Sequence, residues 1–263
     1  MDNFLDKIFF RSRNLNYISQ NLTDLTNQTP ANRIFEALNT YSKSSEVRYV
    51  GGCVRKIIKK QIVDDIDLAT NLKPSEVCDA LKKKEINFYE TGIDHGTITA
   101  IIDKHKYEIT SLRKDVSTDG RHAKVEFSTD WKEDAARRDF SINSIYSDKD
   151  GNLFDPFNGK KDLENGNINF IGNAENRIKE DYLRILRYVR FFINYSNQNH
   201  NPKIIKIIKK NIGGVSKLSS ERLLDEFKKL TKSNAFLKIF KDEISLELIE
   251  IIFPQLKNLE NFK

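Results

Sequence analysis

The sequence has little of what builds disulfide frameworks, zinc sites or membrane spans. Its 263 residues include two cysteines, Cys53 and Cys78, which do not form a Cys-x-x-Cys pair, and four scattered histidines. A disulfide scaffold and a structural zinc site are therefore not expected, and a reducing cytoplasm fits this composition. No apolar run approaches the ~18–20 residues of a membrane span. The N-terminal stretch carries charges within its short apolar segment, unlike a secretory signal, so we expect a cytoplasmic protein without a membrane partner.

What the chain does contain is charge, together with enough apolar material for a core. Hydrophobic residues make up 38% and charged residues 31%, and the net charge is +6. These proportions are typical of a globular protein of one large or two small domains. The basic balance favours a polyanionic partner, although richness in lysine, isoleucine and asparagine would also follow from an AT-rich genome.

Strand patterns lie in the first part of the chain and helical patterns in the second. Residues 1–30 are polar and rich in asparagine, and we treat them as an N-terminal extension. Pro156 marks a change of texture, and beyond Ile178 the helical period continues almost to the end. This order favours an α+β fold, with a strand-containing head over residues 31–155 and an all-α section over residues 156–263.

Hydrophobic periodicity predicts the individual elements. Helices are expected over residues 33–41, 55–59, 74–84 and 131–146, and strands over residues 47–50, 63–68, 96–103 and 105–113. The last two strands are expected to form a hairpin, because only Lys104 separates them. Residues 114–124 combine Ser, Thr, Asp, Gly and charges, which predicts a mobile loop.

The most informative stretch is Tyr49-Val-Gly-Gly-Cys-Val-Arg55, followed ten residues later by Asp65-Ile-Asp67. Side chains at i and i+2 of a strand point to the same face, so Asp65 and Asp67 would aim two carboxylates at one point. Such oxygen ligands suit Mg²⁺, and two such ions about 3.5–4 Å apart promote phosphoryl transfer. The alternative is a solvated acidic turn, since Asp64 adjoins the pair.

The residues before this pair indicate a phosphate-binding turn. Gly51 and Gly52 allow backbone N–H groups to approach phosphate oxygens, and Arg55 adds a guanidinium fork. A plain tight turn would use the same glycines. Glu108 alternates with Tyr107 and Ile109 on an expected strand, which makes it a candidate third carboxylate or an ordinary solvent-facing residue of an edge strand.

Two arginine-rich segments follow. Arg137 and Arg138 are adjacent, so they need partners such as a triphosphate, Asp134 or Asp139, or else they form a surface patch. Further on, the residues of a second segment are spaced by three, which on a helix makes one polar stripe; they are Asp181, Arg184, Arg187 and Arg190. A solvated basic helix face would show the same spacing.

Taken in order, these segments resemble class II tRNA nucleotidyltransferases, the CCA-adding enzymes, and their bacterial poly(A) polymerase relatives. The resemblance runs from about Tyr49 to about Leu230. It rests on the following motifs: Gly51-Gly-Cys-Val-Arg55 with Asp65-Ile-Asp67 and Thr70, His95-Gly-Thr97, Asp119-Gly-Arg-His-Ala-Lys-Val125, Arg137-Arg-Asp-Phe-Ser-Ile-Asn143, Asp155-Pro-Phe157, Glu180-Asp-Tyr-Leu-Arg184, and Ser220-Glu-Arg222 with Asp225-Glu226. The resemblance implies a DNA polymerase beta-like nucleotidyltransferase head, with a small mixed sheet and helices, followed by an all-α neck and body.

The resemblance also implies roles for individual residues. Asp65 and Asp67 would be catalytic metal ligands for Mg²⁺, with Glu108 as a weaker catalytic candidate. The nucleotide would be bound by Gly51, Gly52, Arg55, Arg138, Asp139, Asn143, Asp181, Arg184, Arg187 and Arg190. Within that set, Asp181 and Arg184 would read the base.

Two departures from the family pattern stand out. Lys56 occupies a position where the family usually has Asp, and Lys59-Lys60 lies where a Gly often occurs, so the helix after the glycines is expected to pack differently. Family members also commonly continue further, into body and tail domains that hold the tRNA.

The function that the resemblance implies is addition of CMP and AMP, from CTP and ATP, to the 3′ acceptor end of tRNA without a template. Partial CC or A addition and poly(A) addition use the same chemistry and stay open. A third possibility is a catalytically silent RNA-binding protein of the same fold, against which the intact Asp65 and Asp67 pair counts.

Overall fold

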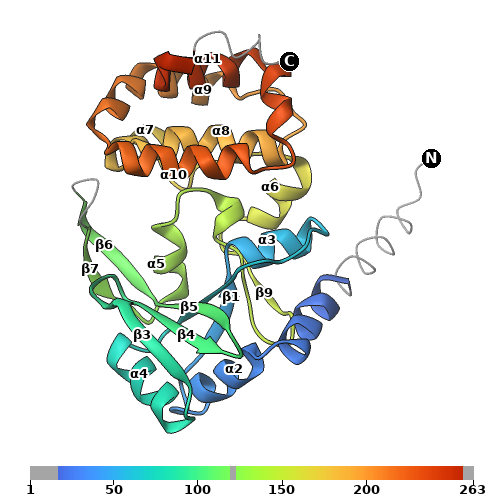
Figure 1. The fold of residues 1–263 in the computed structure, drawn as a ribbon, viewed down its shortest axis with the longest axis vertical. Coiled ribbons are helices and arrows are strands. Elements are labelled where there is room, and N and C mark those ends of the chain that lie inside the picture. Colours follow the sequence, from blue (N-terminus) through green and yellow to red (C-terminus); the bar gives the residue numbers. More distant parts are fainter. Residues whose placement is uncertain (1–16, 119–122, 257–263) are drawn as a thin grey trace. The chain divides into compact units, whose positions relative to one another are not determined.

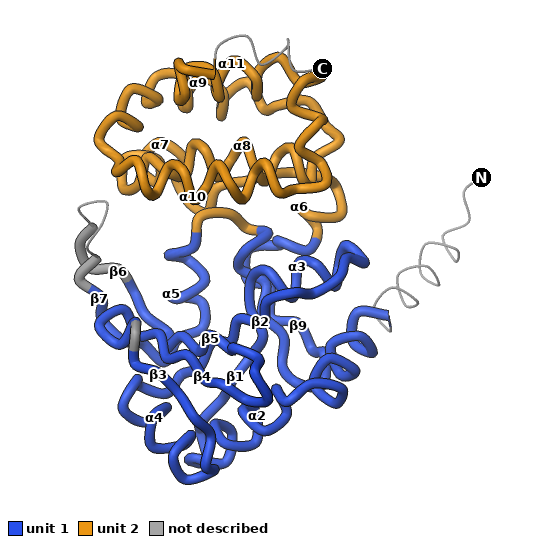
Figure 2. Tube along the Cα trace, viewed as in Figure 1, with its two compact units in different colours: residues 1–116, 125–138, 142–160 blue, residues 117–124, 139–141, 161–263 orange. Residues whose placement is uncertain are grey.

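The computed structural model describes residues 17–118 and 123–256, whose course is drawn in Figure 1. They form two compact units (Figure 2). Unit 1 contains the described residues up to Val116 together with Val125–Arg138 and Ile142–Lys160, and unit 2 contains Asp139–Ser141, the described part of residues 117–124, and the chain from Lys161 onward. No helix in the described ranges is long and apolar enough to cross a membrane.

Unit 1 is built around a seven-stranded mixed sheet with the strand order β3-β4-β5-β2-β1-β8-β9. The strands are β1 Val47–Val50, β2 Ile66–Thr70, β3 Asn87–Gly92, β4 Thr97–Ile102, β5 His105–Ser111, β8 Tyr146–Ser147 and β9 Leu153–Phe154. Strands β2 and β5 run parallel, whereas the other neighbours pair antiparallel. Strands β6 Arg113–Thr118 and β7 Ala123–Phe127 form a separate pair.

The helices of unit 1 cover the sheet and connect its strands. They are residues 17–28, α2 Ala31–Asn39, α3 Gly52–Ile58, α4 Pro74–Lys83 and α5 Trp131–Ala136, with a 3₁₀ turn at Ile93–His95. Each of the long amphipathic helices, α2 and α4, buries one apolar side. Residues 17–28 add Ile18 and Leu22 to the same core.

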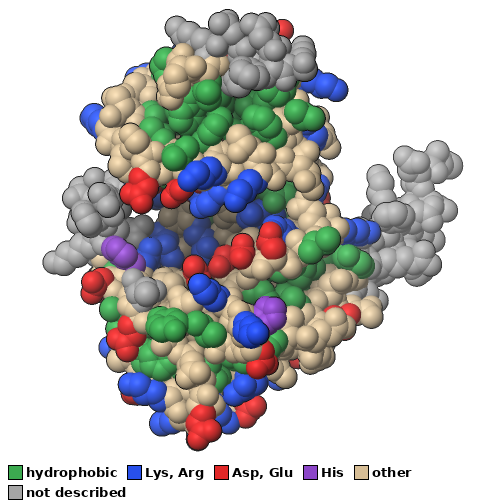
Figure 3. All heavy atoms as spheres, viewed as in Figure 1, with side chains coloured by type: hydrophobic (Ala, Val, Ile, Leu, Met, Phe, Trp, Pro, Cys, Tyr) green, Lys and Arg blue, Asp and Glu red, His purple; other side chains and the backbone are tan. Residues whose placement is uncertain are grey.

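Alternation along β2 and β5 separates the core from the polar face of the sheet. Leu68, Tyr107 and Ile109 are buried in the core that α2 and α4 share. Their neighbours Asp67 and Glu108 must therefore point to the opposite face, because successive strand side chains alternate. On the face of unit 1 drawn in Figure 3, acidic and basic side chains lie interspersed, so the positive net charge is not segregated there.

Unit 2 is helical. Its helices are α7 Ala174–Glu180, α8 Leu183–Tyr195, α9 Pro202–Asn211, α10 Ser220–Thr231 and α11 Glu243–Ile252, with 3₁₀ turns at Ile212–Lys217, Phe236–Lys241 and Pro254–Leu256; α6 Gly159–Asn165 crosses from unit 1. Aromatic rings of Phe140, Phe170, Tyr188 and Phe191 form its core, with the first two centroids 4.7 Å apart. Helix α8 is buried on that side and polar on the other.

Much of this architecture confirms the sequence-based expectation. The mixed-sheet head and the helical section are present, β1 has the predicted limits, and β4 and β5 form the predicted hairpin. Strand β3 was not predicted. Residues 114–118 and 123–124, expected in a loop, belong to β6 and β7 instead, while Asp119-Gly-Arg121 lies outside the described residues.

Two predicted elements have different limits in the structure: one helix ends earlier and one strand begins later. The helix expected over residues 131–146 stops at Ala136, because the backbone beyond it bonds to another segment: Ser141 N donates to Asn169 O, and Ile171 N donates to Asp139 O. The strand expected from residue 63 begins at Ile66, so Asp65 precedes β2 instead of lying within it.

Candidate active site

Two glycines form the turn between β1 and α3. Gly51 has a φ of +69°, a conformation that favours glycine, and its N–H donates to Ile145 O. A Cβ on Gly51 would lie 3.8 Å from Arg138 Nη1, and one on Gly52 would lie 3.9 Å from Asp67 Oδ2. The predicted turn therefore lies beside both a predicted metal ligand and a predicted phosphate-binding arginine.

Carboxylates gather on the polar face next to this turn. Asp67 and Glu108 are direct register partners on the parallel strands β2 and β5, and Asp65 lies two residues before Asp67. Burial raises the pKa of Asp67 to about 6, and the negative charges of Glu108 and Asp65 act in the same direction, against the opposing charges of two arginines. Glu108 and Asp65 are thus both close enough to Asp67 to repel its carboxylate.

The position of Glu108 corrects one of the alternatives considered above. Strand β5 lies between β4 and β2, so this glutamate is not on an edge strand. Across residues 17–118 and 123–256, however, no group of three or more His, Cys, Asp or Glu side chains is arranged to hold a metal ion. Asp65 and Asp67 stay the predicted ligands, with Glu108 as an exposed neighbour.

Arg55 lies in α3 and is buried, with 8% of its surface exposed. One of its guanidinium nitrogens, Nη1, donates to Asn143 Oδ1, and its charge acts on the carboxylate of Asp67. The structure therefore brings together Arg55, Asn143 and Asp67, which are distant in the sequence and belong to different motifs.

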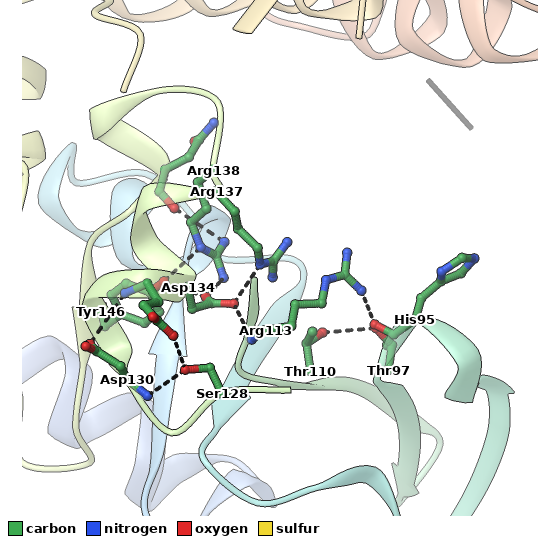
Figure 4. A network of polar contacts seen from close by, with 12 residues as sticks. His95, Thr97, Thr110, Arg113, Ser128, Asp130, Asp134, Arg137, Arg138 and Tyr146 are labelled. Carbon is green, nitrogen blue, oxygen red and sulfur yellow. Dashed lines mark hydrogen bonds and ion pairs between the residues drawn. The ribbon is translucent and has the colours of Figure 1, made fainter. Parts of the chain in front are cut away.

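Arg138 is held by a buried polar network (Figure 4). Its Nε donates to Tyr146 Oη at 2.9 Å, and its Nη2 donates to Asp134 Oδ2 at 3.2 Å. Tyr146 Oη donates in turn to the same Asp134 oxygen at 2.6 Å. Asp134 also accepts from Arg137 Nε at 2.8 Å. Burial by itself would raise the pKa of Asp134, but Arg138 and Arg137 outweigh it and lower the pKa to about 2.

Lys56, the departure in the first motif, has a definite partner. Its ammonium donates to Asp64 Oδ1, and the same oxygen accepts the backbone N–H of Asp65 at 2.9 Å. Lys56 lowers the pKa of Asp64, mainly through this hydrogen bond. A lysine at this position therefore links α3 to the residue next to a predicted metal ligand.

In unit 2 the arginines of α8 are matched by carboxylates. Arg187 Nε donates to the buried Asp139 Oδ2 at 2.7 Å, and Arg190 forms an ion pair with Glu226, which is only 2% exposed. Burial would lower the pKa of Arg187, but Asp139 and then Glu226 raise it above the usual value. These arginines do not form a solvated basic face; their charges are used in the packing of unit 2.

The predicted stripe of four residues is wrong for Asp181. This residue has extended backbone angles at the C-terminal end of α7, and α8 begins only at Leu183, so Asp181 and Arg184 do not share one continuous helix face. Asp181 Oδ1 accepts from Leu183 N at 3.1 Å, and its Oδ2 accepts from Arg222 Nη2 at 2.8 Å.

Arg184 has its own partners. Its Nη1 donates to Glu180 Oε2 at 2.7 Å and to Arg177 O at 2.6 Å. The spacing of three between Asp181 and Arg184 would also suit an ion pair within one helix, but their side chains contact Arg222 and Glu180 instead.

Of the partners predicted for Arg137 and Arg138, Asp134 is confirmed, at three and four residues' spacing. Other residues that organise these sites were given no role by the sequence. Nothing in the sequence pointed to Tyr146, or to the contact between Arg222 and Asp181 across 41 residues.

Comparison with known proteins gives consistent matches. Residues 47–169 match the family described as "Poly A polymerase head domain", and residues 201–260 match the family described as "Probable RNA and SrmB- binding site of polymerase A". The mitochondrial CCA tRNA nucleotidyltransferase 1 of Homo sapiens is 44% identical over 195 residues, covering 73% of this chain and 45% of that protein. The CCA-adding enzyme of Lactobacillus johnsonii is 38% identical over 198 residues, covering 74% and 48%.

Solved structures give the same picture. A Bacillus stearothermophilus CCA-adding enzyme in complex with CTP has a TM-score of 0.70 and 29% identity, covering 82% of this chain and 50% of that one. A tRNA nucleotidyltransferase complexed with a primer tRNA and an incoming ATP analog has a TM-score of 0.66 and 25% identity, covering 88% and 62%. The chain thus spans about half the length of the curated relatives that it matches.

Proposed function

Because the chain belongs to the family that carries the poly A polymerase head domain, we propose that it is a nucleotidyltransferase that adds CMP and AMP, from CTP and ATP, to the 3′ end of tRNA without a template. The observation that carries the proposal is the pair Asp65 and Asp67, set against a glycine turn and two buried or half-buried arginines, Arg55 and Arg138. The names of the relatives support tRNA as the acceptor.

The carboxylates fit a divalent cation. Asp67 is half-buried and lies near two other carboxylates, and both conditions disfavour its charged form more than Arg138 and Arg55 favour it. A bound divalent cation would offset the remaining cost. Their hard oxygen atoms are the ligands that Mg²⁺ prefers. When bound, Mg²⁺ would supply activation of the attacking hydroxyl and stabilisation of the leaving group. Asp65 and Asp67 would hold it, and Glu108 would add negative charge nearby.

The basic groups around the turn would orient the triphosphate. The backbone N–H of Gly52, the first residue of α3, can approach phosphate oxygens closely because neither glycine of the turn carries a Cβ. The N–H of Gly51 donates to Ile145 O and shapes the turn. Arg138 and Arg55 bring positive charge to the same surface, and Asn143 holds Arg55 in place. Their contribution would be to position and neutralise the phosphates.

Base recognition is assigned to Asp181 and Arg184 in unit 2. Cytosine and adenine both present an amino donor beside a ring-nitrogen acceptor, whereas guanine and uracil present the reverse order. A carboxylate only accepts and a guanidinium only donates, so an aspartate with an arginine matches C and A and rejects G and U. Asp139, Arg187 and Arg190 would support this region by fixing α8 through the ion pairs described above.

An incorporation assay separates the candidate functions. The full chain is incubated with Mg²⁺ and a tRNA that lacks its 3′ CCA, with labelled CTP, ATP, UTP or GTP, and the products are sequenced. Ordered addition of two C and one A supports the proposal. Elongation with ATP alone supports poly(A) addition, and addition of only CC or only A supports a partial enzyme. No incorporation, with tRNA still bound, indicates a silent RNA-binding protein.

The sparse cysteines support a reducing compartment such as the cytoplasm as its location.

A further inference from the structure

The hydroxyl of Tyr146 is enclosed in the core of unit 1 and makes two strong polar contacts. Tyr146 has no exposed surface, and its ring packs against Trp131 with centroids 5.5 Å apart. Its Oη accepts from Arg138 Nε and donates to Asp134 Oδ2, while Arg138 also donates to that same oxygen. Tyrosine, aspartate and arginine therefore form a closed three-membered ring of hydrogen bonds (Figure 4).

This ring fixes the direction of the Arg138 side chain. An arginine loses rotamer entropy when it is immobilised, and a guanidinium that is already held loses less when it binds a ligand. Two of its three nitrogens, Nε and Nη2, face Tyr146 and Asp134. The third, Nη1, donates to Asn143 O at 3.4 Å and lies beside the Gly51 turn.

Asp134 alone does not account for this orientation. Its Oδ1 accepts from Arg137 Nε and from Arg113 N at 3.3 Å, while its Oδ2 accepts from Arg138 Nη2 and from Tyr146 Oη. Without the Tyr146 hydroxyl, Arg138 Nε would lose its 2.9 Å acceptor. The longer bonds of Nη2 to Asp134 Oδ2 and of Nη1 to Asn143 O would remain and would hold the guanidinium less firmly.

We propose that Tyr146 is a positioning residue, whose hydroxyl sets Arg138 toward the glycine turn and thereby determines how tightly the incoming nucleotide is bound. The inference rests on the proposed function, and specifically on the assignment of Arg138 to nucleotide binding. Tyr146 itself touches no substrate in this account. It acts only through the arginine.

The first test is Tyr146→Phe, which removes one oxygen atom and keeps the ring. We expect the KM for CTP and ATP to rise about tenfold, as for the loss of one charge-assisted hydrogen bond, with kcat changed less than about threefold. Tyr49→Phe is the matched control. Tyr49 is also fully buried in unit 1, and its hydroxyl is 2.9 Å from Thr26 Oγ1. The control should keep both constants within about twofold.

A double-mutant cycle then tests the route of the effect. In an Arg138→Ala background, Tyr146→Phe should change KM by less than about twofold, because the group that it positions is gone. An unchanged KM in the single Tyr146→Phe variant would overturn the proposal. So would a full tenfold effect of Tyr146→Phe that persists without Arg138.

The design separates this inference from the function on which it rests. If the wild type adds no nucleotide, the proposed function fails, and the same cycle is measured as CTP binding by calorimetry. If Arg138→Ala binds CTP normally, the role of Arg138 fails. If Tyr146→Phe does not fold, fluorotyrosines placed at position 146 weaken the hydroxyl as an acceptor without removing it, and KM should rise with increasing fluorination. A flat series would contradict the positioning role.

Discussion

The charged residues of unit 1 and unit 2 were predicted from similar motifs but are used differently. In unit 1, Asp65, Asp67 and Glu108 are like charges held near one another, and burial with mutual repulsion raises the pKa of Asp67. In unit 2, Arg190 is paired with Glu226 and Arg187 with Asp139. Side chains that form ion pairs within the fold stabilise it. A cluster of side chains with the same charge indicates instead that a ligand is to supply the opposite charge.

The largest expected effect lies in the unmatched cluster. Asp65→Ala or Asp67→Ala should lower the rate of nucleotide addition by about a thousandfold or more, because several kcal/mol of transition-state stabilisation depend on the cation that they would hold. Single-turnover assays with labelled CTP measure this loss, and circular dichroism checks the fold. Near-normal turnover in either variant would show that the substituted aspartate is not needed to hold the cation.

Breaking an ion pair of unit 2 should lower the stability of the fold. Glu226→Gln leaves Arg190 without its buried anion, so the free energy of unfolding should fall by about 3–5 kcal/mol. Asp225→Asn on the same helix is the control, since that side chain is 61% exposed and should change stability by less than about 0.5 kcal/mol. Denaturant unfolding measures both. Equal, small changes would mean that the pairing in unit 2 is not structural.

Asp181 lies between the two classes, because it is paired with Arg222 yet assigned to base recognition. Asp181→Ala should raise the incorporation of UTP and GTP relative to CTP and ATP by about tenfold or more, since the acceptor that rejects them is lost. The control is Glu175→Ala, which removes an α7 carboxylate paired with Lys179 and Lys210. Full retention of the C and A preference in Asp181→Ala, at normal rates, would make this aspartate a structural residue.

The smallest effect is expected at the partly exposed ion pair of Lys56 with Asp64, beside the carboxylates of unit 1. Lys56→Asp places like charges opposite Asp64 and next to Asp65, so kcat/KM should fall about two- to fivefold, which is the scale of a partly exposed ion pair. The double reversal, Lys56→Asp with Asp64→Lys, should restore it to within about twofold. The same reversal at Lys84 and Glu36, another exposed pair, should leave activity unchanged. Failure of the double reversal to restore activity would separate Lys56 from the cluster.

The two units also show which features of the structure could be predicted from the sequence. Local spacing predicted β1, the β4–β5 hairpin and the α8 helix, because alternation and helical period record which side chains face a core. It placed Asp67 and Glu108 on strands, and their parallel pairing follows from the order of the strands in the sheet, which spacing does not encode. No pattern predicted long-range contacts such as Arg55 with Asn143; the resemblance to a family implied only that both residues belong to the nucleotide-binding set.

The misplacements have a common physical origin. The expected helix over residues 131–146 ends early because the backbone near Phe140 bonds to residues 169–171, and a tertiary contact of that kind leaves no local pattern. Asp181 interrupts a helical period because its carboxylate is used by Leu183 N and Arg222. The domain limits at residues 30 and 155 and the roles of the site residues stay predictions.

The central claim is that Arg138 and Arg55 only partly offset the negative charge around Asp67, and that a divalent cation is to provide the rest. Thermal unfolding of Asp67→Asn tests this claim most directly. A carboxyl group whose pKa is raised to about 6 is destabilising when ionised, and that penalty is complete above pH 6 and absent below the usual value of 3.8. In metal-free buffer at pH 7.5, about 1.5 units above that pKa, Asp67→Asn should therefore unfold at a higher temperature than the wild type, by on the order of 1 kcal/mol of stability. Adding Mg²⁺ and CTP should raise the wild-type midpoint more than that of the variant, so that the difference narrows or reverses. A variant that is less stable without metal, or equal shifts in both proteins on adding Mg²⁺ and CTP, would contradict the account.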